Sequence, residues 1–67
     1  MRYFFHVYDE DGMILDKQGE YFLNDDEAKA HAEKIRQELV FDDARYGSVL
    51  QLVNERGEEL MRVRLQP

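Results

Sequence analysis

The carboxylates near the N-terminus are the residues of this sequence that come nearest to a chemical site. Asp9-Glu10-Asp11-Gly12 is followed closely by Asp16, and oxygen-rich turns of this kind can hold Ca²⁺. The complete calcium-loop pattern is not met, because Gly12 comes too early and no Glu stands at the closing position. Aspartates in such turns also accept hydrogen bonds from nearby backbone amides. The stretch therefore indicates a structural turn rather than a metal site.

Neither the histidines nor the single serine complete a metal-binding or catalytic set. A zinc site needs three or four ligands, and the chain offers His6 and His31 without any cysteine. We expect these histidines on different surfaces, one in a strand and one on a helix. Ser48 lacks the G-x-S-x-G motif of a nucleophile, and the glycines stand singly, unlike those of a phosphate-binding loop. The sequence predicts no enzyme activity, no metal and no cofactor.

Length and charge restrict the chain to one small acidic domain, residues 1–67. The 67 residues are 43% hydrophobic and 36% charged, with a formal net charge of −6. Small domains bury a small share of their surface, so most large apolar side chains are needed for the core. No apolar stretch approaches the ~20 residues of a membrane helix, and no export signal is visible. We expect a cytoplasmic protein without membrane contact, and the acidic charge makes nucleic acid an unfavourable partner.

The elements that must position these residues begin with a strand over Arg2–Tyr8, because that run is almost entirely aromatic and apolar. A turn at Asp9–Gly12, a short apolar patch at 13–15 and a second turn at 16–19 follow. Glu20–Leu23 then predicts a second short strand. Together these segments predict an N-terminal hairpin with a long, irregular connection.

A helix is predicted next, beginning at Asn24. Its side chain can cap the helix, and Glu27 stands three residues later, as in a capping box. Apolar residues recur at helical spacing from Ala28 to about Tyr46 and form one stripe. Gly47 is suited to the position after the helix.

The last third of the chain predicts a second hairpin. Its strands are Ser48–Asn54 and Glu59–Leu65, with Gly57 in the connecting loop. The resulting fold class is α+β, a two-layer ββαββ arrangement with an antiparallel four-stranded sheet and one helix packed on one face.

The order of these signals resembles a family of small bacterial domains of unknown function. The resemblance rests on an opening of the RYFFHVxDxDG type, on D-x-x-G-x-x-x-L before the helix, and on a closing hairpin of the form V-N-E-x-G-E-x-L-x-x-V. It covers nearly the whole chain. The resemblance implies a small α+β protein and brings no assigned activity, cofactor or catalytic residue.

One helix can cover only one face of a four-stranded sheet, so the other face is the candidate site. If Tyr3, Phe5 and Val7 face the helix, the opposite face carries Phe4, His6, Tyr8, Val49, Gln51, Val53, Arg62 and Arg64. Exposed apolar patches of this kind often mark interfaces, and Tyr and Arg commonly anchor protein contacts. The sequence therefore predicts a non-enzymatic protein-interaction or self-association module, with a protein partner or a homodimer contact on this face or at a sheet edge.

Two alternatives remain open at this point. Aromatic and arginine side chains on an open sheet can also stack and hold single-stranded nucleic acid, although the negative net charge opposes it. Alternatively, the outer aromatic residues could pack beneath the loop at 9–19 or beneath the chain ends and leave no interface there.

Overall fold

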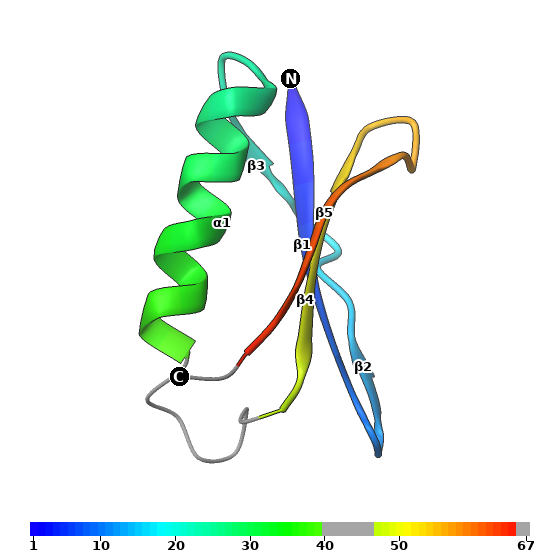
Figure 1. Ribbon diagram of the computed structural model, residues 1–67. Helices are drawn as coiled ribbons and strands as arrows, with labels where there is room; N and C mark the ends of the chain where they lie inside the picture. The colour runs from blue at the N-terminus through cyan, green and yellow to red at the C-terminus, as the bar shows by residue number, and fades with distance from the viewer. Residues whose placement is uncertain (40–46, 66–67) are drawn as a thin grey trace.

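The computed structural model describes residues 1–39 and 47–65. Five strands and one helix make up this part of the chain (Figure 1): β1 Arg2–Asp9, β2 Gly12–Ile14, β3 Glu20–Tyr21, α1 Asp25–Leu39, β4 Val49–Asn54 and β5 Glu59–Arg64. Strands and helix form two layers, with α1 on one side of an antiparallel sheet. The predicted α+β class and the single covering helix are thereby confirmed.

The sheet has the strand order β2-β1-β4-β5, and β3 also pairs with β1. The β1–β4 ladder extends from Tyr3 opposite Asn54 to Tyr8 opposite Val49. All pairings are antiparallel. The first and last thirds of the chain therefore meet at the centre of the sheet, and this pairing determines which side chains share a face.

The strand count is larger than the four expected from the sequence. The apolar patch at 13–15 contributes to a strand of its own, β2, which pairs with the end of β1 from Val7 to Asp9. The predicted strand Glu20–Leu23 is shortened to the two residues of β3, which pair with Arg2 and Tyr3. β2 and β3 thus lie one after the other along the same edge of β1, separated by the 15–19 loop.

Helix α1 begins where the capping pattern predicted. The Asn24 side-chain oxygen accepts a hydrogen bond from the Glu27 backbone N–H (2.9 Å), and the Glu27 carboxylate accepts one from the Leu23 N–H (3.1 Å). Asp25, Asp26 and Glu27 place negative charge at the positive end of the helix dipole. The predicted continuation from Leu39 to Tyr46 falls on residues 40–46, outside the described residues.

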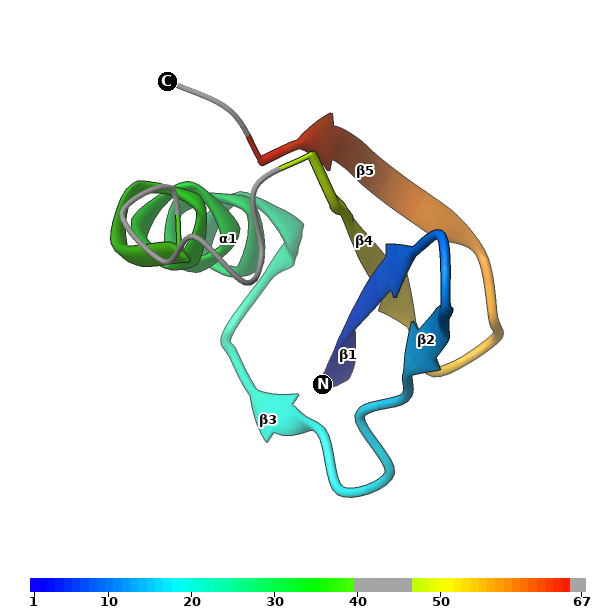
Figure 2. The same cartoon turned by 90° about the horizontal axis from the view of Figure 1, so that it is seen from below.

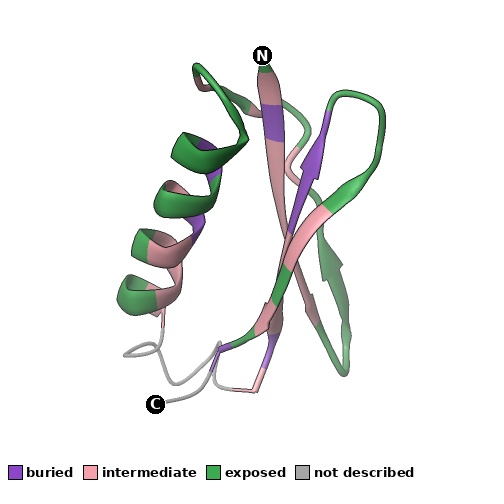
Figure 3. Cartoon of the chain, turned by 45° about the horizontal axis from the view of Figure 1, so that its top comes forward, coloured by how far each residue is buried: buried purple, intermediate pink, exposed green. Residues whose placement is uncertain are grey.

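The core lies between α1 and the sheet face that the sequence assigned to it. Its fully buried members come from β1, α1, β4 and the residue after β5: Tyr3, Ala28, Ala32, Leu50, Leu52 and Leu65. Figure 3 shows the buried positions of α1 turned toward the sheet. Small alanines on the helix allow its backbone to approach the large side chains of the sheet closely. The prediction that α1 packs on the Phe5 and Val7 side, rather than on the Phe4 and Tyr8 side, is confirmed.

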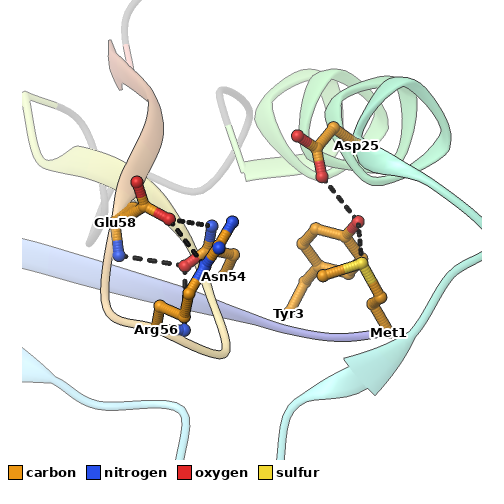
Figure 4. Close-up of polar contacts among 6 residues, drawn as sticks. All are labelled: Met1, Tyr3, Asp25, Asn54, Arg56 and Glu58. Carbon is orange, nitrogen blue, oxygen red and sulfur yellow. Dashed lines mark hydrogen bonds and ion pairs between the residues drawn. The ribbon is translucent and has the colours of Figure 1, made fainter.

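Two polar clusters hold the ends of these elements in place (Figure 4). The buried Tyr3 hydroxyl donates a hydrogen bond to the Asp25 carboxylate (2.7 Å), which joins β1 to the start of α1. In the β4–β5 hairpin, the buried Asn54 side-chain oxygen accepts from the backbone N–H groups of Arg56 (2.9 Å) and Glu58 (3.0 Å). Asn54 thereby closes the loop that the sequence placed around Gly57.

Candidate interaction face

The predicted face exists as one continuous surface on the side of the sheet away from α1. Its eight residues, here called the outer face, are Phe4, His6, Tyr8, Val49, Gln51, Val53, Arg62 and Arg64. Strand register brings them together, because Tyr8 pairs with Val49 and Val49 with Arg64. The next row joins His6, Gln51 and Arg62 in the same way. Every residue that the sequence assigned to this face therefore lies on it.

The outer face is less exposed than its composition suggested. Val53 is buried, with 8% of its surface accessible. Phe4, His6, Tyr8, Val49 and Gln51 are half-buried, and the two arginines are exposed. Lateral packing among neighbouring side chains accounts for part of this shielding: the rings of Phe4 and His6 stack with their centroids 6.3 Å apart and their planes 16° from parallel.

The 15–19 loop covers one end of the outer face. The Asp16 backbone N–H donates to Nδ1 of His6 (3.0 Å). A Cβ atom at Gly19 would lie 3.0 Å from the Phe4 ring and 2.7 Å from the Tyr3 carbonyl oxygen. The alternative in which aromatic residues pack under this loop thus applies to Phe4 and His6. The open part of the face is centred on Tyr8, Val49 and Gln51.

Asp16 holds the 15–19 loop in place. Its carboxylate accepts hydrogen bonds from the backbone N–H groups of Phe5 (3.2 Å), Gln18 (3.3 Å) and Gly19 (2.9 Å). Burial raises the pKa of Asp16, but these amides and the nearby His6 more than offset it, so the pKa lies below its usual value. Between the part of β1 that pairs with β2 and the part that pairs with β3, the Asp16 carboxylate therefore accepts the backbone hydrogen bond of Phe5.

A chain of hydrogen bonds crosses the open part of the face. The Tyr8 hydroxyl donates to the Gln51 side-chain oxygen (2.6 Å), and the Gln51 amide donates to Glu59 (3.2 Å). Glu59 also pairs with Arg62 through its Nε (2.5 Å). The hydrogen bond from Arg62 lowers the pKa of Glu59 and outweighs the opposing effect of desolvation, with a smaller contribution from Gln51. Arg62 thus has a carboxylate partner within the chain.

Arg64 differs from Arg62 in having no carboxylate partner among residues 1–39 and 47–65. Its Nη1 donates to the Gly47 carbonyl oxygen (3.3 Å). An open hollow of about 290 Å³ beside it is lined by Tyr8, Asp9, Glu10, Gly47, Val49 and Arg64. The outer face therefore ends in a cationic guanidinium and an aromatic hydroxyl, next to an acidic turn.

The acidic turn is shaped by a hydrogen bond of its own. The Asp9 carboxylate accepts a hydrogen bond from the Asp11 N–H (2.9 Å), as short aspartate turns do. Asp16 lies outside this turn, beside Phe5 and His6 of β1, and its carboxylate accepts from the backbone N–H groups of Phe5, Gln18 and Gly19. Within the described part of the chain, no group of three or more His, Cys, Asp or Glu residues is placed to hold a metal ion.

His31 lies on the α1 side of the sheet and His6 on the other face, as expected, with His31 at the border of the core. Its ring is 5.3 Å from that of Phe5 and 5.0 Å from that of Phe22, measured between centroids. Its Nε2 lies 3.2 Å from a carboxylate oxygen of Glu20. An open hollow of about 520 Å³ adjoins these rings, and charged side chains of α1, Glu27, Glu33 and Lys34, stand at its rim. The position of His31 is explained by packing between β3 and α1.

The largest exposed apolar side chains lie outside the predicted face. Met13, Ile14 and Leu15 on and after β2 are about half exposed, and Tyr21 and Leu23 are more so. The 13–15 patch was expected between two turns, without a surface role. The sequence signal for an exposed patch is the run of three consecutive apolar residues between an acidic turn and a glycine-containing turn.

Fold and face together define a class: a small α+β domain in which one helix covers one face of an antiparallel sheet and leaves a partly apolar face open. The chain belongs to the family described as Domain of unknown function (DUF6894), which residues 2–66 match. The resemblance to a family of small domains of unknown function is thereby confirmed. No curated protein and no solved structure matches the chain. No helix in the described ranges has the length and apolar character needed to cross a membrane.

Proposed function

We propose that this chain is a non-enzymatic protein-interaction module that contacts its partner through the open part of the outer face. The observation that carries the proposal is the combination of half-buried Tyr8, Val49 and Gln51 with the exposed guanidinium of Arg64. Such a centre, apolar and aromatic with an arginine at its border, has the composition of protein–protein hot spots. Among the described residues, α1 lies on the opposite side of the sheet, and the 15–19 loop reaches Phe4 and His6 rather than this region.

The chemistry of the face favours protein over nucleic acid. Phosphate binding requires cations that are available to the backbone of the nucleic acid. Arg62 is already engaged by Glu59, and Asp9 and Glu10 line the same hollow as Arg64. A flat protein surface, with an acidic side chain opposite Arg64 and an apolar side chain opposite Val49, fits the face better than a phosphate backbone does.

Site-specific photo-cross-linking in cells tests the proposal. A benzoylphenylalanine at position 10 replaces exposed Glu10, which lines the hollow beside Arg64, whereas one at position 29 replaces exposed Lys29 on α1 and serves as the matched control. We expect a partner protein to be captured from position 10 and not from position 29. The purified partner should then lose affinity about tenfold or more for Arg64→Glu, as for a hot-spot arginine.

Three results would count against this function. The first is equal capture from positions 29 and 10, which would indicate contact by chance. The second is an unchanged affinity of the purified partner for Arg64→Glu. The third is salt-sensitive binding of a labelled single-stranded oligonucleotide to the pure protein, which would favour the nucleic-acid alternative.

A further inference from the structure

We infer that the outer face binds a second copy of this chain, and that the two copies meet face to face with Arg64 of each against the acidic turn (residues 9–11) of the other. This inference rests on the function proposed above, because it names an occupant for the same face. Figure 2 looks along the strands and shows α1 on one side of the sheet. The contact lies on the other side.

The first observation is a row of four side chains that crosses the whole sheet on the outer face. Met13 of β2 pairs with Tyr8 of β1. Tyr8 pairs with Val49 of β4, and Val49 pairs with Arg64 of β5. Residues directly opposite each other in an antiparallel ladder place their side chains on the same face. Met13, which is 52% exposed, therefore extends the open part of the outer face to β2.

The second observation is that opposite charges stand toward opposite ends of this row. Arg64 lies on β5, whereas Asp9 and Glu10 follow Tyr8 at the end of β1, two strands away. All of them line the same hollow. Within the described ranges, no ion pair joins Arg64 to either carboxylate. A row with an apolar centre and opposite charges at its ends is complementary to a reversed copy of itself.

One two-fold axis reverses the row in this way. It runs along the strands, between the two faces and midway between β1 and β4. Tyr8 then lies over Val49 of the second copy, and Arg64 of the second copy crosses Met13 to reach the acidic turn. An arginine can pack its aliphatic stem on an apolar side chain while its head binds a carboxylate. Two antiparallel sheets commonly pack face to face in this aligned manner.

The second copy thereby supplies the chemistry that the outer face requires of a partner. Glu10 of one copy stands beside Arg64 of the other, and Tyr8 stands opposite Val49. The remaining in-plane axis, which runs along the row itself, gives no such match. It sets every residue against its own counterpart, so that guanidinium faces guanidinium and carboxylates face carboxylates. Like charges brought together disfavour that arrangement.

The 15–19 loop limits the extent of this contact. It lies over Phe4 and His6, so the two copies meet through the Tyr8 end of the outer face. A contact of so few residues is smaller than the interfaces of stable complexes. The dimer is therefore weak, and its population depends on protein concentration.

Sedimentation velocity of the pure chain over a concentration series tests the inference. We expect the wild-type chain to shift from monomer to dimer and to stop there, because a two-fold contact is closed. Arg64→Glu and Glu10→Arg each set like charges against each other, and each should weaken dimerisation about tenfold, equivalent to about 1.4 kcal/mol. Their matched controls, Lys29→Glu and Glu38→Arg, change the net charge equally at exposed positions of α1 and should dimerise normally. Circular dichroism checks that all variants remain folded.

A charge exchange tests the pairing of Arg64 with the acidic turn. The double variant Glu10→Arg/Arg64→Glu should recover wild-type association. An equimolar mixture of the two single variants should form a heterodimer, because both contacts of the mixed pair then join opposite charges. Undiminished dimerisation of Arg64→Glu would overturn the inference, as would oligomers larger than a dimer or a wild-type chain that stays monomeric into the millimolar range. A monomeric chain that still captures a different protein from position 10 would remove the second copy and leave the function proposed above in place.

Discussion

At the scale of single residues, Tyr3 links the two layers. Its ring is buried in the core, while its hydroxyl reaches the Asp25 carboxylate at the first turn of α1. The hydrogen bond to Asp25 and the burial of the ring raise the pKa of Tyr3 to about 12, with a further contribution from the negative charge of Asp25. The folded chain therefore favours the neutral phenol.

The raised pKa of Tyr3 predicts a loss of stability in alkaline solution. An unfolded tyrosine ionises near pH 10, so the unfolded chain releases this proton first. The stabilisation is complete below about pH 10 and declines as the pH rises toward about 12. Tyr3→Phe should be less stable than wild type at pH 8, and the difference should shrink between about pH 10 and pH 12. Urea unfolding of both proteins, followed by circular dichroism, measures it; a difference that is constant with pH would contradict this account.

At the scale of elements, the 15–19 loop determines how β2 and β3 lie along β1. Gly19 lies at φ 71°, in the left-handed region, and its backbone passes the Tyr3 carbonyl so closely that an added Cβ would lie 2.7 Å from the oxygen. Gly57, in the β4–β5 hairpin, has a similar φ of 79° with open space around it. Both glycines therefore adopt a backbone conformation that disfavours a Cβ atom, but only Gly19 is crowded by neighbouring atoms.

This difference predicts unequal effects of the same substitution. Gly57→Ala should cost about 1 kcal/mol, the penalty of a left-handed conformation for a residue with a Cβ. Gly19→Ala adds a clash with backbone that cannot move without breaking the β1–β3 pairing, so the total should be about 3 kcal/mol. Thermal and urea unfolding compare the two variants, and hydrogen exchange at Tyr21 and Phe22 reports on β3. An equal loss of stability in the two variants would contradict this account, because it would show that the 15–19 loop relaxes freely around the added Cβ atom.

At the scale of the whole molecule, the net charge of −6 is spread over a small surface. Close ion pairs such as Arg62 with Glu59 and Arg36 with Glu33 are local. The excess carboxylates repel one another at longer range, and salt screens this repulsion.

The charge excess predicts stabilisation by moderate salt. Raising NaCl from about 20 mM to about 150 mM should increase the midpoint of thermal unfolding, because the Debye length falls to about 8 Å. Glu10→Gln/Glu38→Gln, which removes two exposed carboxylates that take no part in the ion pairs named above, should show a smaller increase. Calorimetry at dilute protein concentration measures both. A midpoint that falls with salt would mean that the attractive pairs outweigh the repulsion.

The sequence by itself determined the layers and the faces. Alternation along β5 separated core-facing from outward-facing side chains, the two-residue period of a strand divided the apolar run of β1 between the two faces, and the capping pair Asn24 and Glu27 marked the start of α1. These features depend on residues that are close in sequence, so the spacing of those residues along the chain determines which face of a strand or helix they share. For the same reason, all eight residues of the candidate face could be named before their contacts were known.

Tertiary structure alone decided how open that face is and where the exposed apolar residues lie. Phe4 and His6 are covered because Asp16 and Gly19, ten or more residues away, fold back over them. The 13–15 patch became an edge strand because β1 offered it a pairing partner that local pattern could not reveal. Solvent exposure is a property of all the segments that meet at a site, and long-range pairing is what brings those segments together.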